Sequence, residues 1–324
     1  MRKTRFHIPA LLHVVLCDYL ALTRPRVVLM VLVTTYVGFY LGSSGVLDWG
    51  CLFKTIIGTA LGAGGTLALN QYLEKDVDTR MKRTRLRPLP DGRLQPVEVL
   101  IFGATLAIAG PLYLIIAVNP LSGLVTGTIV LSYLFAYTPL KRKSPLCSIV
   151  GAIPGALPPV IGWVAASGDL GLGAWMLFAI LFLWQLPHSL AIACLYREDY
   201  ARAGIRVLPV IEPDGRSTGR LIVCSSLGLL LVSLLPTLTG LAGSVYLMTA
   251  FVLGVAFLGC GFVVARRRSA ESARHLLFAS LVYLAVLLVA MAFDKAPENG
   301  TAERLDDNIL PIINMLAIKY EKGG

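Results

Sequence analysis

Charged residues are scarce in this chain, because Asp, Glu, Lys and Arg together make up only 15% of its 324 residues. Hydrophobic residues make up 56%, and the mean hydropathy is +0.73. A water-soluble domain needs a charged surface that this composition does not supply. We therefore expect an all-α polytopic membrane protein.

Several familiar signals are also missing. The six cysteines include no Cys-x-x-Cys pair, so we expect small buried apolar residues rather than a zinc or redox site. The basic N-terminus is not followed by a short apolar core and a small-residue cleavage site, so we expect no removed signal. The net charge of +10 would suit a nucleic-acid-binding protein, but the basic residues lie between long apolar runs, and we expect no nucleic-acid partner.

Nine segments are apolar over about the 20 residues that a membrane helix requires. They lie near 27–43, 51–73, 96–117, 120–137, 147–167, 172–195, 219–238, 243–265 and 275–293. We expect residues 1–295 to form one intramembrane domain around a central cavity. The remainder, 296–324, is a polar tail whose one apolar stretch is too short to span a membrane.

The basic residues test this count. Of the 29 Lys and Arg residues, 24 fall in the N-terminal segment and in every second connection between the nine segments. Lys and Arg are enriched in cytoplasmic connections. The asymmetry predicts nine spans with a cytoplasmic N-terminus.

Acidic side chains gather where the second span ends. Successive steps of four turn a helix by about 40°, so Asn70, Glu74 and Asp78 share one face if the helix continues that far. Carboxylates so close together at a membrane helix end repel each other unless a cation neutralises them. Mg²⁺ fits, because it takes one or two carboxylates and completes its shell with water and phosphate. We expect Glu74 and Asp78 to be metal ligands and Asn70 to assist them.

The same segment supplies Lys82, Arg83 and Arg87 as candidate diphosphate ligands. Acids that hold Mg²⁺ beside bases that neutralise phosphate oxygens are the two halves of a diphosphate site. The alternative is a solvated helix end whose acids and bases pair with one another.

A second acidic cluster follows the sixth span. Asp199 is expected to complete the metal site with Glu74 and Asp78, whereas Glu198 is expected to pair with Arg197 or Arg202.

Within the sixth span, His188 is an ionisable residue at membrane depth, which favours a functional role: metal ligation, a porphyrin contact or proton transfer. The alternative is a neutral imidazole hydrogen-bonded to a neighbouring helix. Pro187 could break the helix beside it and make the spot more cavity-like.

Three further side chains are candidate substrate contacts. Lys141 follows the fourth span and could reach a diphosphate, while Tyr137 and Trp184 could stabilise a carbocation through their π faces. The alternatives are topological marking for the lysine and packing for the aromatics. For Arg24 and Arg26, before the first span, we favour the topological interpretation.

These residues resemble a known family. The run from Asn70 to Asp78, followed by basic residues and Arg87-Pro88, resembles the first aspartate-rich motif of the UbiA-type intramembrane prenyltransferases. Within that superfamily, six motifs in the same order resemble the protoheme IX farnesyltransferases, or haem O synthases. They begin at Leu22-Thr-Arg-Pro, Arg83-Thr, Tyr137-Thr-Pro-Leu-Lys, Gly151-Ala-Ile-Pro, Trp184-Gln-Leu-Pro-His and Asp199-Tyr.

The resemblance implies nine helices around a cavity open to lipid, Mg²⁺ as cofactor, and transfer of a farnesyl group from farnesyl diphosphate to a vinyl group of haem B. The absence of a transit peptide favours the bacterial inner membrane over a mitochondrial one, and we expect a haem A synthase as a partner. Two departures stand out: Glu74 replaces the more usual aspartate, and Ala203 stands where a second aspartate often follows Asp199.

Three alternatives remain at this stage. A relative that prenylates a quinone precursor or another tetrapyrrole would have similar acidic motifs. A secondary transporter would carry its polar groups nearer the membrane midplane. A structural subunit or haem chaperone gives no reason for the three acids.

Overall fold

The computed structural model describes residues 16–212 and 214–296, and regular structure in these ranges is helical except for one β-bridge between Ala242 and Lys295. The all-α class is confirmed. The tail beyond residue 296 lies outside the described residues, so its predicted role stays a prediction.

Nine helical segments among the described residues are long and apolar enough to cross a membrane, as predicted. The spans are α2 (Pro25–Gly42), α3 (Trp49–Leu73), α5 (Pro96–Ala117), α6 (Pro120–Leu131) with η1 (Ser132–Tyr137) and α7 (Thr138–Leu140), α8 (Cys147–Ala156) with α9 (Pro158–Ser167), α10 (Leu172–Leu195), α13 (Arg216–Leu238), α14 (Ser244–Arg267) and α15 (Ala270–Phe293).

Local sequence explains where these helices begin. Pro25, Pro96, Pro120 and Pro158 each occupy the first turn of a helix, where a missing N–H costs no hydrogen bond. Asn119 separates α5 from α6, and its side chain accepts a hydrogen bond from the Ser122 N–H at 2.8 Å. The third and fourth spans are therefore distinct helices.

Glycines bring α3 and α5 into close contact. A Cβ atom on Gly65 would lie 2.2 Å from the Ala107 backbone nitrogen, and one on Gly110 would lie 2.3 Å from the Gly62 nitrogen. No side chain fits at these positions. Small residues are what membrane helices use to pack backbone against backbone, since lipid provides no hydrophobic drive between helices.

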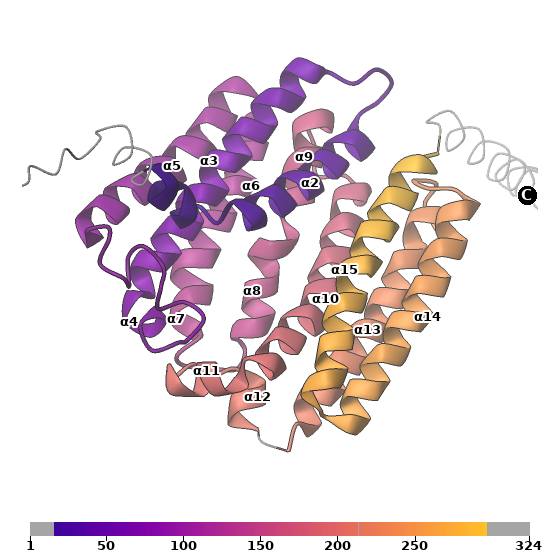
Figure 1. The fold of residues 1–324 in the computed structure, drawn as a ribbon. Coiled ribbons are helices and arrows are strands. Elements are labelled where there is room, and N and C mark those ends of the chain that lie inside the picture. The colour runs from indigo at the N-terminus through magenta and orange to yellow at the C-terminus, as the bar shows by residue number, and fades with distance from the viewer. Residues whose placement is uncertain (1–15, 213, 297–324) are drawn as a thin grey trace, which may run out of the picture.

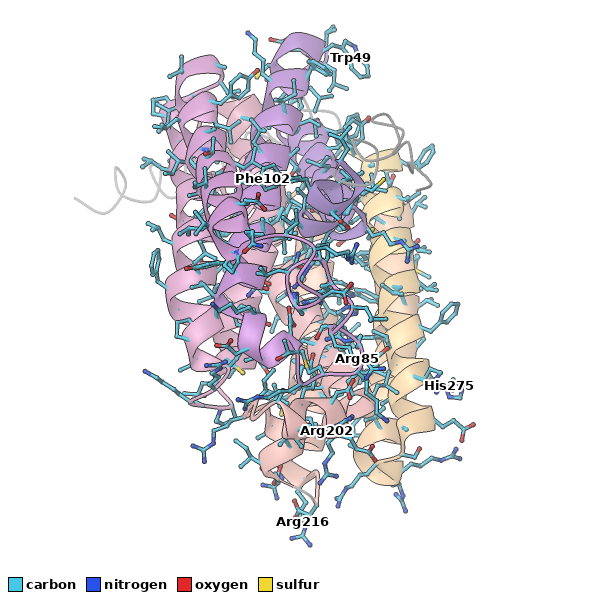
Figure 2. All side chains as sticks on the ribbon, turned by 60° about the vertical axis from the view of Figure 1, so that its left-hand side comes forward. Trp49, Arg85, Phe102, Arg202, Arg216 and His275 are labelled. Carbon is cyan, nitrogen blue, oxygen red and sulfur yellow. The ribbon has the colours of Figure 1, made fainter. Side chains whose placement is uncertain are left out.

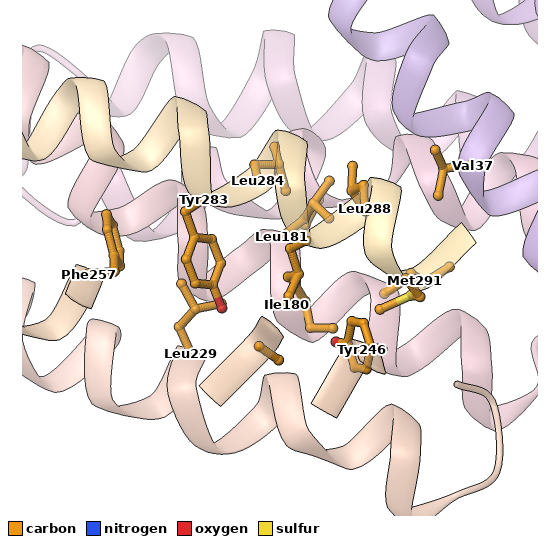
Figure 3. Close-up of a cluster of buried hydrophobic side chains, with 14 of the residues drawn as sticks. Val37, Ile180, Leu181, Leu229, Tyr246, Phe257, Tyr283, Leu284, Leu288 and Met291 are labelled. Atoms are coloured by element: carbon orange, nitrogen blue, oxygen red, sulfur yellow. The ribbon is translucent and has the colours of Figure 1, made fainter. Parts of the chain in front are cut away.

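The largest hydrophobic cluster of the described residues joins α10, α13, α14 and α15, with Val37 of α2 at its edge (Figure 3). Tyr283 is central to it. Its hydroxyl hydrogen-bonds Ser233 at 2.7 Å, and its ring lies 5.2 Å from that of Phe257, centre to centre. This hydrogen bond satisfies two buried hydroxyls and joins α13 to α15 within the cluster.

The short helices α4 (Lys75–Asp78), α11 (Arg197–Arg202) and α12 (Leu208–Ile211) lie with α7 at one end of the bundle (Figure 1). Figure 2 shows Arg85, Arg202 and Arg216 near this end and Trp49 at the other. The acidic segments that follow α3 and α10 therefore reach the same end of the molecule, together with the basic connections.

Candidate active site

A cavity of about 560 Å³ opens among the helices, lined by residues of α2, α3, α6, η1, α8, α10 and α15. Glu74, Asp78 and several basic side chains line its polar end. Apolar residues such as Met30, Leu67 and Ile129 line its body. The cavity thus combines an apolar interior with a charged end, which we call the charged mouth and which contains Glu74, Asp78, Arg83, Arg87 and Lys141.

The first acidic motif is built differently from one continuous helix. Helix α3 ends at Leu73, and Glu74 is its C-cap residue, with φ −99° and ψ 10°. The chain then turns into α4, where the Asp78 N–H donates to the Glu74 carbonyl at 2.8 Å. Both carboxylates line the cavity, but not on the one continuous helix face with Asn70 that the spacing suggested, because α3 ends before them.

Asn70 is fully buried and is not among the cavity-lining residues. Its amide donates to the Thr138 hydroxyl at 3.2 Å, and its carbonyl oxygen accepts from the Arg24 guanidinium at 3.4 Å. Asn70 therefore ties α2, α3 and α7 together beneath the charged mouth.

Each cavity acid already has a cationic partner. Arg87 Nη1 lies 2.6 Å from Asp78 Oδ2, and Lys141 Nζ lies 2.7 Å from Glu74 Oε1. Burial lowers the pKa of Arg87, aided by nearby Arg24 and opposed by Asp78. Burial also opposes the charge on Lys141, but Tyr137 and Glu74 outweigh it and raise the pKa of Lys141. Both cations are thus held at the mouth by the acids.

Asp78 keeps one unsatisfied oxygen. Its side chain is 1% exposed, and Oδ1 is buried without a hydrogen-bond partner among the described residues. A buried carboxylate oxygen without a partner is costly, and native proteins tolerate such atoms chiefly where a ligand or water completes them.

Asp199 behaves differently from our expectation. It pairs with Arg202, three residues along α11, and is not among the residues that line the cavity, although its neighbour Tyr200 is. We expected Glu198 to be the paired acid; that was wrong, because one helical turn sets Asp199 against Arg202 while Glu198 offers Arg202 its backbone carbonyl. As a metal ligand, Asp199 stays a prediction.

The candidate diphosphate ligands divide into two groups. Arg83, Arg87 and Lys141 line the cavity, and the Arg83 guanidinium lies over the Tyr196 ring at 4.9 Å. Lys82 is exposed and is not among the lining residues, so the structure does not bring it to the site.

A π-helical turn shapes the wall next to Lys141. Residues of η1 include Tyr133 and Tyr137, whose rings meet edge to face at 5.0 Å between centres. Lys141 Nζ lies 4.4 Å from the centre of the Tyr137 ring. π-Helical turns are frequent at functional sites. This one places two tyrosines on the cavity, of which the sequence analysis proposed only Tyr137.

Both aromatic candidates of α10 line the cavity. Trp184 and His188 stack with 4.7 Å between ring centres, and His188 Nδ1 lies 2.8 Å from the Ser280 hydroxyl of α15. The imidazole is hydrogen-bonded to a neighbouring helix and also faces the cavity, so the two interpretations of His188 are compatible. Pro187 does not break the helix, which we considered from the sequence: α10 continues through it to Leu195.

Arg24 is a cavity residue for which we favoured the topological interpretation over a diphosphate contact. It lines the cavity with Arg26, and its backbone takes the left-handed conformation, φ 50°. Such a conformation costs a non-glycine residue about 1–3 kcal/mol and is concentrated at functional sites. The sequence did offer a diphosphate contact as the alternative to topology, but an Arg-Pro pair before a span is also what a topological marker looks like.

A divalent cation fits part of the predicted acid set. Among residues 16–212 and 214–296, no group of three or more His, Cys, Asp or Glu side chains forms a cluster able to hold a metal ion. Two carboxylates are nevertheless enough for Mg²⁺ when substrate phosphate and water complete its shell. Glu74 and Asp78 would supply them, and Asp78 Oδ1 has no hydrogen-bond partner among the described residues.

Comparison with known proteins agrees with the fold. The model of the UbiA prenyltransferase family matches residues 31–291. A protoheme IX farnesyltransferase of Solibacter usitatus is 47% identical over 287 residues, which cover 86% of this chain and 98% of that protein.

Two solved structures share the fold at low identity. A structure of digeranylgeranylglyceryl phosphate synthase aligns with a TM-score of 0.74 at 17% identity, covering 86% of this chain and 98% of that one. A UbiA homolog from Archaeoglobus fulgidus, bound to GPP and Mg²⁺, aligns with a TM-score of 0.61 at 17% identity over 85% of this chain and 99% of that one. This chain therefore belongs to the UbiA prenyltransferase family, and within it to the protoheme IX farnesyltransferases.

Proposed function

We propose that this protein transfers the farnesyl group of farnesyl diphosphate to a vinyl group of protohaem IX, with addition of water, to give haem O and diphosphate. The observation that carries the proposal is a cavity among the described residues in which paired acids and bases at one end adjoin an apolar body that contains His188. The names of the relatives support the choice of acceptor.

The charged mouth suits the diphosphate. Arg24, Arg83, Arg87 and Lys141 offer cationic donors to phosphate oxygens. When substrate arrives, Arg87 and Lys141 would exchange a carboxylate partner for a phosphate oxygen. The carboxylates of Glu74 and Asp78 would then be free to hold a divalent ion.

We infer that this ion is Mg²⁺, which when bound would neutralise part of the diphosphate charge. Asn70, which contacts Arg24 and Thr138, would position the mouth. Asp199, paired with Arg202 here, stays a predicted third acid.

Bond cleavage follows from this electrostatic arrangement. The C1–O bond of farnesyl diphosphate breaks and its electron pair leaves with diphosphate, where Arg87 and Lys141 stabilise the developing charge. The allylic cation would lie near the rings of Tyr133 and Tyr137, which line the cavity and would stabilise it and exclude bulk water.

The acceptor then supplies the electrons. A vinyl π pair of protohaem forms the new C–C bond, and the resulting cation next to the pyrrole takes up one water molecule, which releases a proton. Trp184 and His188, on the α10 wall, are the proposed contacts of the porphyrin. Lys82, exposed outside the cavity, has no assigned role in this scheme.

Placement in the cell is part of the proposal. The nine spans make this a multi-pass membrane protein, and we propose the bacterial inner membrane with the basic end of the bundle in the cytoplasm. That orientation would give farnesyl diphosphate access from the cytoplasm. A haem A synthase, which would use the product, is the proposed partner.

The test is to express the chain in a bacterial host that lacks its own haem O synthase and to identify extracted haems by mass. The expected product exceeds protohaem by one farnesyl group and one water. Asp169→Asn is a matched control, because this exposed acid lies between α9 and α10, away from the acidic segments. A farnesylated product other than haem O, or none from a folded protein, would overturn the proposal.

A further inference from the structure

Ser280 of α15 contacts both aromatic residues that line the α10 wall. Its hydroxyl lies 2.8 Å from His188 Nδ1, and its backbone carbonyl accepts the Trp184 indole N–H at 2.7 Å. Ser280 is fully buried. It does not line the cavity, so any influence on the reaction passes through its neighbours.

The hydrogen bonds of the Ser280 hydroxyl favour one tautomer of His188. Ser280 Oγ donates to the Leu277 carbonyl at 2.6 Å. A serine hydroxyl has one hydrogen, so with that hydrogen on Leu277 it can only accept from the imidazole. This pairing favours the tautomer in which His188 Nδ1 carries the proton and Nε2 carries the lone pair of a neutral ring.

Nε2 is the atom left open. No hydrogen bond to it is present among the described residues, and it is not one of the buried polar atoms without partners, so it is accessible. The ring lines the cavity and is held on one face by Trp184, with 22° between the ring planes. These contacts therefore favour one protonation state and one orientation of the ring.

A neutral imidazole with a free Nε2 lone pair is the side chain that most often binds a metal ion. In such sites the other ring N–H usually donates to a second residue, which fixes the tautomer and raises the basicity of the ligand. A substrate that brings its own iron would meet this arrangement in the cavity. A metal-free acceptor would gain nothing from it.

We propose that Ser280 is a positioning residue that holds His188 in the Nδ1–H tautomer, so that Nε2 binds the iron of the porphyrin acceptor axially. The inference rests on the proposed function, since it requires protohaem as the acceptor. It assigns to the serine on α15 a role in acceptor selection: iron protoporphyrin is preferred over the metal-free ring.

The experiment titrates the detergent-purified protein with ferric protohaem IX and, separately, with metal-free protoporphyrin IX. Ser280→Ala should weaken haem binding by about 10- to 100-fold, the range for loss of a residue that supports a metal ligand. It should also shift the haem absorption band away from that of the wild type and leave metal-free porphyrin binding unchanged. Ser280→Thr keeps the hydroxyl and should retain wild-type haem binding.

The matched control is Ser233→Ala. Ser233 is also a fully buried serine whose hydroxyl contacts α15, at Tyr283, but it does not line the cavity or touch His188. Its loss should leave both titrations unchanged. Thermal unfolding of each variant, measured in the same detergent, separates loss of fold from loss of ligation.

Two results would overturn the inference. If Ser280→Ala weakens haem and metal-free porphyrin equally, the serine only packs α15 against α10. If its haem spectrum and affinity match the wild type while haem O still forms, Ser280 has no such role and the proposed function stands. Failure of the wild type to bind haem or form haem O would remove both proposals.

Discussion

Asp78→Asn is expected to remove most of the transferase activity while leaving the fold intact. The carboxylate is 1% exposed, with Oδ2 on Arg87 at 2.6 Å and Oδ1 without a partner. The amide oxygen of asparagine can still accept from Arg87. The unpartnered Oδ1 becomes an amide NH2 group that is equally without a partner, so this half of the side chain changes stability little. We expect the lost ion pair to lower the unfolding free energy by about 1–3 kcal/mol, because Asp78 is buried whereas the Arg87 side chain stays 23% exposed.

The effect on catalysis should be larger. If Asp78 helps to stabilise the departing diphosphate, losing its charge should slow transfer by about 100- to 1,000-fold, or about 3–4 kcal/mol, as for other charge-stabilising groups. The assay is single-turnover formation of haem O, followed by mass across a Mg²⁺ titration, with thermal unfolding measured in parallel. Asp169→Asn serves as the exposed control.

The converse variant tests the same ion pair from its other side. Arg87→Met leaves the Asp78 carboxylate buried and unpaired, which should cost stability by about 3 kcal/mol. Adding Asp78→Asn to it should restore part of that stability without restoring activity. Normal turnover of Asp78→Asn at limiting Mg²⁺ would refute this reasoning, and Asp78 would then be only a charged helix end.

Three further predictions concern other parts of the molecule. Arg24→Gln removes a cavity cation and should raise the KM for farnesyl diphosphate about 10-fold with a smaller change in kcat, which steady-state kinetics would show; equal KM values would return Arg24 to a topological role. A reporter fused after Gly92 should read cytoplasmic and one after Lys295 external, and agreement between the two would contradict nine spans. Gly110→Ala places a Cβ atom 2.3 Å from the α3 backbone and should lower the unfolding free energy by about 1–3 kcal/mol, whereas Gly127→Ala, with nothing within 4 Å, should not; thermal unfolding of both variants checks this.

Much of the site follows from sequence because its residues sit beside span boundaries. Glu74, Asp78, Arg87 and Lys141 all lie within a short stretch of a helix end, and all line the cavity at the same end of the bundle. The alternation of spans and connections is enough to bring them to one side of the membrane. Lys82 lies in the same connection yet is exposed, because the side of the membrane on which a residue lies does not determine which way its side chain points.

The partners of these residues were not predictable in the same way. Glu74 pairs with Lys141 at 67 positions' separation, Arg24 with Asn70 at 46, and His188 with Ser280 at 92. Each contact depends on the rotation of two packed helices about their axes. A sequence without alignment contains no direct record of those rotations.

Sequence by itself determined the nine spans, the segregation of basic connections and the presence of an acidic, basic and imidazole-bearing set, because hydropathy and charge act over about 20 consecutive residues. Tertiary structure decided which of these side chains line the cavity. Arg24 and Tyr133 line it, Lys82 does not, and Asp199 forms an ion pair with Arg202. Tertiary structure also decided the contact of His188 with a serine on a distant helix. The physical reason is that desolvation is set by local composition, whereas hydrogen bonds act over about 3 Å and depend on helix packing.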